Sequence, residues 1–292
     1  MPDTVEFAGP GGRLLDVEID GPTDGRALIF HTGTPSAGQL YAPMLEAGAA
    51  RGIRHVMYSR PGYGKSARAP ERTVADCATD VVAVADWLGV DRFFTVGWSG
   101  GGPHALACAA ILPERVIAAA TMAGPAPRDA DGLDWTAGMG TENLEEFGAA
   151  DAGEEQLRAY LERVGPEFAH TTGPDVHAAL GYLLSEVDAG ALTGEFAEYL
   201  AAAIRVGLER GIWGWLDDDL AFVRDWGFDL TAITVPVSIW QGGQDRFVPY
   251  AHGQWLAEHV PSASPQLHPD HGHLSLAVDS YGAILDDLIA RV

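Results

Sequence analysis

Short runs of β-branched and aromatic residues alternate along this chain with alanine-rich runs, and this alternation strongly limits the possible folds. The short runs have the length and composition of buried strands, whereas the alanine-rich runs show the apolar spacing of helices. Such alternation is typical of an α/β protein with a mostly parallel central sheet flanked by helices. We expect strands at residues 27–31, 55–58, 92–96, 116–122, 235–241 and 264–268, and helices at residues 40–51, 74–88, 103–111, 251–259 and 274–291. The turn GPGG between residues 4–7 and 14–19 predicts an antiparallel hairpin before them.

The alternation stops between residues 124 and 230, where no convincing buried strand occurs. This stretch instead carries amphipathic patterns, which predict helices at residues 154–164, 175–187, 194–209 and 216–225. We therefore expect a core formed by residues 1–124 and 231–292, with a helical cap at residues 125–230. A helical block set inside a βα series usually covers a site, because ligands bind beyond the carboxyl ends of parallel strands.

The chain is strongly acidic, which limits its partners. Its 292 residues include 41 Asp and Glu but 18 Lys and Arg, for a net charge of −23. Such a surface repels phosphate backbones and anionic lipid headgroups, so we expect a small-molecule substrate and no nucleic-acid or membrane partner. The acidic residues are spread along the chain, with short clusters such as residues 217–219, and we interpret this charge as favouring solubility.

Cysteine content and the first residues indicate the compartment. Cys77 and Cys108 both lie in apolar, helix-patterned stretches, so we expect two buried free thiols and no metal site. The opening sequence MPDTVEF has neither a basic nor an apolar region of the secretory type, and no stretch has the length of a membrane span. We expect a cytoplasmic protein that is a monomer or a homodimer.

The sequence Gly97-Trp98-Ser99-Gly100-Gly101 is the main chemical signal. It follows a predicted strand and precedes a predicted helix. A serine on a sharp strand-to-helix turn needs small neighbours, and it lies at a helix N-terminus that favours developing negative charge. A tight turn without chemistry is the alternative interpretation, but the surrounding strand and helix favour Ser99 as a nucleophile.

A serine alcohol is a weak nucleophile, so it needs a base and an acid that orients the base. Asp245 follows the predicted strand 235–241 and is the candidate acid, although an Asp after two glycines is often only a surface turn residue. The last predicted strand is followed by His271-Gly272-His273. We prefer His273 as the base because it directly precedes the final helix, and His271 is the competing candidate.

Five segments together resemble the α/β-hydrolase superfamily, close to its capped esterase- and lactonase-like branch. They are the nucleophile turn GWSGG, the acid turn GGQDRFVP, the histidine turn HGHL, the loop HTGTP at residues 31–35 and the segment SRPGYGKS at residues 59–66. The order Ser99, Asp245, His273 matches the family's order of nucleophile, acid and histidine. The similarity covers nearly the whole chain except the insertion. It implies an α/β-hydrolase fold with a helical cap inserted after the sixth strand.

The resemblance also implies an oxyanion hole built from two backbone amides. The residue after the glycine of the HTGTP loop supplies one amide in the family, which points to Thr34 with Gly33 as its neighbour. This loop carries one extra residue between the histidine and the glycine, so its register stays open. The second amide belongs to Gly100, after the nucleophile. Asp129 lies where some relatives place the acid and is a fallback for Asp245.

The implied reaction is acyl transfer to Ser99 followed by hydrolysis, with no metal or nicotinamide cofactor. We expect Gly33, Trp98, Trp213 and Trp215 to contact the substrate. The insertion is rich in aromatic residues, which favours an ester, thioester or lactone of a small hydrophobic substrate, although most of these rings could simply pack the cap. A carbon–carbon bond hydrolase or lyase using the same three residues is one alternative, and a non-catalytic ligand-binding protein is another.

Overall fold

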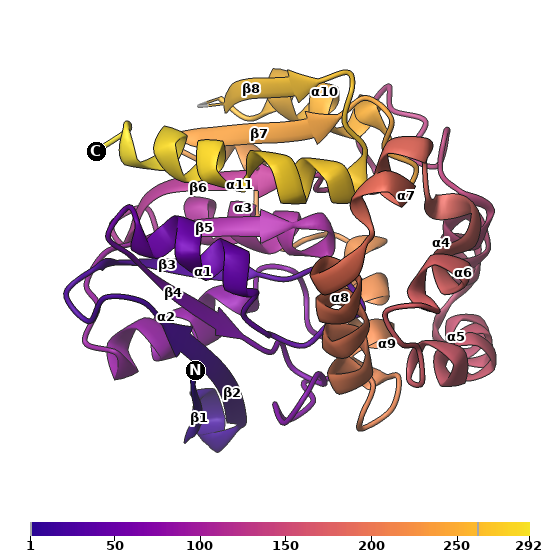
Figure 1. Cartoon of the computed structure of the whole chain (residues 1–292), viewed down its shortest axis with the longest axis horizontal. Coiled ribbons are helices and arrows are strands. Elements are labelled where there is room, and N and C mark those ends of the chain that lie inside the picture. The colour runs from indigo at the N-terminus through magenta and orange to yellow at the C-terminus, as the bar shows by residue number, and fades with distance from the viewer. Residues whose placement is uncertain (1, 262) are drawn as a thin grey trace.

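The computed structural model describes residues 2–261 and 263–292, in which eight strands form a single sheet (Figure 1). The strands are β1 (Asp3–Ala8), β2 (Leu14–Asp20), β3 (Arg26–His31), β4 (Ile53–Tyr58), β5 (Phe93–Trp98), β6 (Val116–Met122), β7 (Val237–Gly242) and β8 (Ala263–His268). Their order across the sheet is β1-β2-β4-β3-β5-β6-β7-β8. The pairs β1–β2 and β2–β4 are antiparallel, and every other pair is parallel. The predicted mostly parallel sheet with its leading hairpin is therefore confirmed.

Helices cover both faces of this sheet. Side chains alternate between the faces along a strand, so Leu28 and Phe30 belong to one apolar cluster and Ile29 to the other. Residues of α11 (His273–Ile289) complete the first cluster. The second cluster contains residues of α2 (Cys77–Trp87), α3 (Gly102–Ile111) and α10 (Tyr250–His259). Helix α1 (Ala42–Ala49) lies on the same side as α11 (Figure 1).

The segment between β6 and β7 is helical and gathers beyond the carboxyl ends of the parallel strands (Figure 1). Its α-helices, here called the cap helices, are α4 (Thr141–Ala152), α5 (Glu154–Phe168), α6 (Val176–Leu180), α7 (Glu186–Ala191), α8 (Gly194–Gly207) and α9 (Trp213–Phe222). Leucines of α5, α8 and α9 share the first apolar cluster with Trp98 of β5. The cap helices are therefore packed onto the sheet next to the predicted nucleophile turn.

Two details of the cap helices differ from the prediction. The single helix expected at residues 175–187 is wrong, because Gly181 adopts a φ of +50° and the chain there divides into α6, a 3-10 turn and α7. Helix α4 was not expected, since it buries little apolar surface beyond Ala150 and so lacks a clear apolar stripe.

Two further expectations concern the chain as a whole. Cys77 and Cys108 are both buried free thiols, as predicted. Over the described ranges, no helix combines the length and apolar character needed to cross a membrane.

Candidate active site

Ser99 lies on a sharp turn between a strand and a helix. Strand β5 ends at Trp98, one 3-10 turn (Ser99–Gly101) follows, and α3 continues from it. The φ angle of Ser99 is +54°, in the left-handed region that residues with a side chain rarely adopt. A Cβ atom on Gly97 would lie 2.1 Å from the carbonyl oxygen of Gly101, so the turn can close only with glycine at this position. Close packing on both sides of Ser99 therefore keeps its backbone in this strained conformation.

Asp245 and His273 are in direct contact although 28 residues separate them in sequence. Nδ1 of His273 lies 2.8 Å from Oδ2 of Asp245, and both side chains are buried. The other carboxylate oxygen accepts the backbone N–H groups of Phe247 and Val248, each at 2.8 Å. Burial raises the pKa of Asp245, and the neighbouring His273 acts against this rise. With Nδ1 donating to the carboxylate, Nε2 of the imidazole is left as an acceptor.

Ser99 and His273 line the same cavity of about 430 Å³. Gly33, Thr34 and Trp98 also contribute to its wall. The structure therefore brings Ser99, Asp245 and His273 to one site.

The competing histidine lies elsewhere. Nε2 of His271 is 3.7 Å from the carboxylate of Asp279, and this contact is partly exposed. The carboxylate near His271 thus differs from that of Asp245, which His273 contacts.

Asp188 on α7 caps the helix that begins at His273. Its carboxylate accepts the backbone N–H groups of His273 at 2.9 Å, Leu274 at 2.8 Å and Ser275 at 2.9 Å. Asp188 is fully buried, and its own position is fixed by the hydroxyl of Ser185 at 3.0 Å. A carboxylate at this place satisfies amides that have no intrahelical acceptor and complements the helix dipole. Sequence reasoning missed this residue, because it expected one helix over residues 175–187 and placed Asp188 just beyond its end.

Thr34 and Gly100 face each other beside Ser99. A Cβ atom on Gly100 would lie 2.6 Å from Oγ1 of Thr34, and one on Gly33 would lie 3.2 Å from Cβ of Ser99. Among the described residues, the backbone N–H of Thr34 has no bonded acceptor. The N–H of Gly100 belongs to a first helical turn, where amides have no intrahelical acceptor. Thr34 and Gly100 therefore place two backbone amides close to Ser99.

A buried arginine binds the loop that carries Thr34. Arg60 donates to the carbonyl oxygens of Thr32 at 2.5 Å and Gly33 at 3.2 Å, and to Oγ1 of Thr34 at 3.1 Å. Its guanidinium also pairs with Asp218 of α9 at 2.6 Å. A cap helix and the loop beside Ser99 therefore share one buried arginine.

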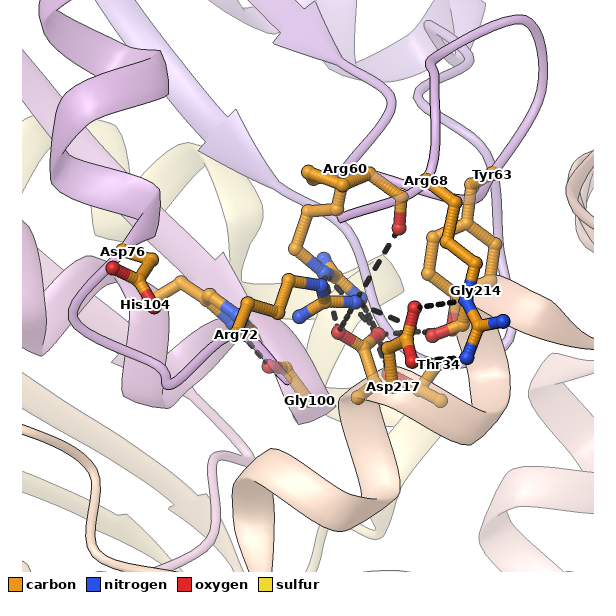
Figure 2. Close-up of polar contacts among 12 residues, drawn as sticks. Thr34, Arg60, Tyr63, Arg68, Arg72, Asp76, Gly100, His104, Gly214 and Asp217 are labelled. Carbon is orange, nitrogen blue, oxygen red and sulfur yellow. Dashed lines mark hydrogen bonds and ion pairs between the residues drawn. The ribbon is translucent and has the colours of Figure 1, made fainter. Parts of the chain in front are cut away.

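Asp218 accepts hydrogen bonds from several members of this buried cluster. Figure 2 shows Arg60, Arg72 and Tyr63 pointing toward one another in it. Arg72 lies 2.7 Å from Oδ1 of Asp218, and the hydroxyls of Tyr63 and Thr34 donate to Oδ2 at 2.9 and 2.7 Å. Burial alone would disfavour the charged carboxylate, but Arg60 and Arg72 hold the pKa of Asp218 well below its usual range. Asp218 is consequently ionised at neutral pH.

The interpretation of the acidic run as solubilising surface charge is wrong for residues 217–219. All three side chains are buried, and Asp217 pairs with Arg68 at 2.8 Å. The physical reason is that α9 places the run against the arginines of the SRPGYGKS segment and its continuation. The signal that could have indicated this was an acidic run enclosed by the apolar sequences WGWL and LAF.

A second cavity of about 650 Å³ adjoins the first at Ser99. Aromatic side chains of the cap and of the loop after β7 line its wall, together with Thr34, Gly100 and two carboxyl groups. The aromatic residues are Trp135, Phe147, Phe168, Trp215, Phe222 and Phe247. Trp215, one of the expected substrate contacts, is among them.

Trp213 and Asp129 lie away from these two cavities. Trp213 is 37% exposed and stacks against the guanidinium of Arg68, whose carbon is 4.5 Å from the ring centroid. Asp129 lines an outer pocket with Trp226 and Trp255, and neither of the cavities at Ser99 contains it. Trp213 and Asp129 thus lie outside the two cavities that Ser99 lines.

Comparison with known proteins agrees with this architecture. A family model described as the alpha/beta hydrolase fold matches residues 26–280. RutD of Caulobacter sp., whose assignment as a carbamate hydrolase is itself provisional, is 28% identical over 269 residues, covering 90% of this chain and 89% of RutD. The 2-hydroxy-6-oxononadienedioate/2-hydroxy-6-oxononatrienedioate hydrolase of Klebsiella pneumoniae is 25% identical over 295 residues, covering 96% of this chain and 93% of that protein.

The fold also matches that of a solved structure, an esterase from Rhodococcus sp.. The TM-score is 0.69 with 20% sequence identity, and the match covers 99% of each chain. At this identity the likeness concerns the fold alone. Because the family model spans most of the sequence, this chain belongs to the family of hydrolases that share the α/β-hydrolase fold.

Proposed function

We propose that this protein is a serine hydrolase that cleaves an ester, thioester or lactone of a small hydrophobic substrate through an acyl-enzyme. The observation that carries the proposal is the 2.8 Å contact between His273 and Asp245 beside a cavity that Ser99 also lines. A nucleophile, a base and a carboxylate that orients the base are the groups that this chemistry requires.

In the proposed mechanism, Nε2 of His273 takes the proton of the Ser99 hydroxyl as it attacks the substrate carbonyl carbon. Asp245 keeps the imidazole in the required tautomer and stabilises the imidazolium that forms. The amides of Thr34 and Gly100 bind the oxyanion, and each such donor is typically worth about 3 kcal/mol. The imidazolium then protonates the leaving alcohol or thiol, and a water molecule, activated by His273, hydrolyses the acyl-enzyme.

The walls of the two cavities favour an apolar body in the substrate. Besides the aromatic side chains of the larger cavity, Leu180, Leu200 and Ile204 line the smaller one. Apolar walls with a few polar groups are typical of small-molecule sites.

A carbon–carbon bond hydrolase using the same residues is the second candidate. The observation that favours it is the match over 96% of this chain to the Klebsiella protein, whose named substrate is a hydroxy-oxo-dienedioate and not an ester. The two candidates differ in whether simple esters are turned over at all.

Labelling with a fluorophosphonate probe tests the proposal, since the probe reacts with an activated serine. We expect wild type to be labelled and Ser99→Ala to remain unlabelled. His273→Ala should lower the labelling rate by at least about a thousandfold, because the serine loses its base. The matched control is His271→Ala, for which we expect the wild-type rate.

Two results would contradict the proposal. Persistent labelling of Ser99→Ala would remove the nucleophile assignment, and loss of labelling only in His271→Ala would transfer the role of base to that residue. A panel of p-nitrophenyl esters of increasing acyl length then tests the reaction, and labelled protein that turns over none of them would favour the carbon–carbon candidate.

A further inference from the structure

Two carboxyl groups from different cap helices meet on the wall of the larger cavity. Glu146 comes from α4 and Asp219 from α9, and both line the cavity together with Ser99. Oε1 of Glu146 accepts the indole N–H of Trp215 at 2.8 Å. The carboxyls of Glu146 and Asp219 are near enough for each to affect the pKa of the other. The mechanism proposed above makes no use of either group.

Asp219 is the less satisfied member of this pair. Its side chain is 1% exposed, yet no N–H or O–H donor of the described residues reaches either carboxylate oxygen. Its neighbour Asp218, by contrast, accepts hydrogen bonds from Arg60, Arg72 and Tyr63. A buried carboxyl without a donor is costly unless it is protonated or a ligand supplies the donor. The unpartnered group on a cavity wall therefore points to a ligand.

Burial and mutual repulsion favour one proton and one negative charge on this pair of carboxyls. Burial raises the pKa of both carboxyls, and the proximity of Glu146 raises the pKa of Asp219 further. Two neighbouring buried carboxyls cannot both ionise readily, so one proton for the pair is the favoured state. Arg72 lowers the pKa of Asp219 from a distance, but its guanidinium is bonded to Asp218.

Aromatic rings line the same cavity as this pair of carboxyls. Trp135, Phe147, Phe168 and Phe222 line the same cavity, and so does Trp215, the donor to Glu146. The faces of aromatic rings attract cations, and a desolvated ammonium gains more from them than an exposed one. A negative charge among aromatic faces suits a protonated amine better than a carboxylate or a neutral sugar.

We propose that Glu146 and Asp219 form a subsite for a protonated amine on the substrate, so that the preferred substrates are esters with an apolar body and one ammonium group. This inference rests on the proposed serine hydrolase function and adds a substrate class to it. The ammonium N–H group would supply the donor that Asp219 lacks, while the aromatic side chains would contact its carbon substituents.

A pair of nearly isosteric esters tests this subsite. In 2-(dimethylamino)ethyl butanoate a protonated nitrogen occupies the position of one carbon of 3-methylbutyl butanoate, so charge is the main difference. We expect wild type at pH 7 to prefer the ammonium ester at least about tenfold in kcat/KM. The double variant Glu146→Gln/Asp219→Asn removes the charge with little change in volume, and its preference should fall to about one.

The single variants are the matched controls. Glu146→Gln and Asp219→Asn each leave one carboxylate, which loses its need to share a proton, so each should retain a preference for the ammonium ester. Glu145→Gln removes an exposed carboxylate next in sequence and should behave as wild type. Circular dichroism and the rate of labelling by the uncharged fluorophosphonate report whether the double variant is folded with a reactive serine.

Calorimetric titration separates failure of this inference from failure of the proposed function. Both esters are titrated into Ser99→Ala with and without the two carboxyl substitutions, so that binding is measured without turnover. Tighter binding of the ammonium ester that is lost with both carboxyls supports the subsite even if wild type hydrolyses neither ester. Equal binding of the two esters, or a preference that survives in the double variant, would overturn it.

Discussion

The carboxylate of Asp188 accepts a hydrogen bond from the backbone N–H of His273 at 2.9 Å. Asp188 belongs to α7, a cap helix, whereas His273 begins the last helix of the sheet-bearing part of the chain. The position of the predicted base therefore depends on a residue that lies 85 positions earlier in sequence.

Replacing Asp188 by alanine should reduce both stability and activity. The variant leaves three buried N–H groups at the start of α11 without their acceptor. We expect a loss of at least about 2 kcal/mol in the free energy of unfolding, measured by urea denaturation. A fall in kcat should accompany it, because His273 loses its backbone anchor. Asp229, which caps an exposed 3-10 turn, provides the control, and Asp229→Ala should alter the urea midpoint much less.

Asp218→Asn should destabilise the protein strongly. The substitution leaves the buried guanidiniums of Arg60 and Arg72 without their counter-charge. Removing one partner of a buried ion pair typically costs about 3–5 kcal/mol. Thermal and urea unfolding measure the loss. Arg163→Ala, which breaks an exposed pair with Glu145, should cost less than about 1 kcal/mol, and similar losses in the two variants would contradict the central role of Asp218.

Asp245→Asn should lower kcat while leaving the fold intact. The amide keeps the shape of the side chain but favours the wrong imidazole tautomer, and in serine hydrolases such a change typically lowers kcat by about 10⁴-fold. Steady-state kinetics with p-nitrophenyl butanoate measure the effect, and circular dichroism reports the fold. Asp129→Asn should keep wild-type kcat, and the reverse result would restore Asp129 as the acid.

His55 should make stability depend on pH in the mildly acidic range. Burial lowers its pKa to about 4, whereas an unfolded histidine titrates near 6.5. The unfolded state therefore binds more protons between these values, so the stability due to neutral His55 is complete above pH 6.5 and decreases as the pH falls toward 4.

The measurement compares wild type with His55→Gln. Between pH 7 and pH 5, the free energy of unfolding of wild type should fall by about 2 kcal/mol more than that of the variant. The difference isolates His55 from other groups with shifted pKa values, and parallel pH curves would exclude this role.

Sequence patterns predicted the sheet well because its strands are signalled locally. Most of the parallel strands are short apolar runs, and the turn at Ser99 requires glycine where GWSGG places it, since a side chain at Gly97 would collide with the backbone. Likewise, the candidates Asp245 and His273 could be chosen because both follow strands that end at the same edge of the sheet.

The contacts between the cap helices and the sheet could not be predicted in this way. Asp218 and Arg60 lie 158 positions apart, and nothing next to Asp218 in sequence indicates that Arg60 is its partner. Net charge is equally uninformative, because it counts a buried aspartate and a solvated one alike. Trp213 shows the same limit, since its indole covers Arg68 at the surface and the ring two residues later lines the cavity.

Asp188 and Asp218 together limit how this enzyme could be re-engineered. Grafting foreign cap helices onto the sheet is an obvious way to change specificity. Here, however, one cap aspartate holds the start of α11, and another pairs with the arginine that binds the loop carrying Thr34. A cap taken from another protein would have to place an acidic side chain at each of these two positions. Without them, the start of α11 would lack its capping carboxylate, and the buried Arg60 and Arg72 would lack their counter-charge, whatever pocket the graft supplied.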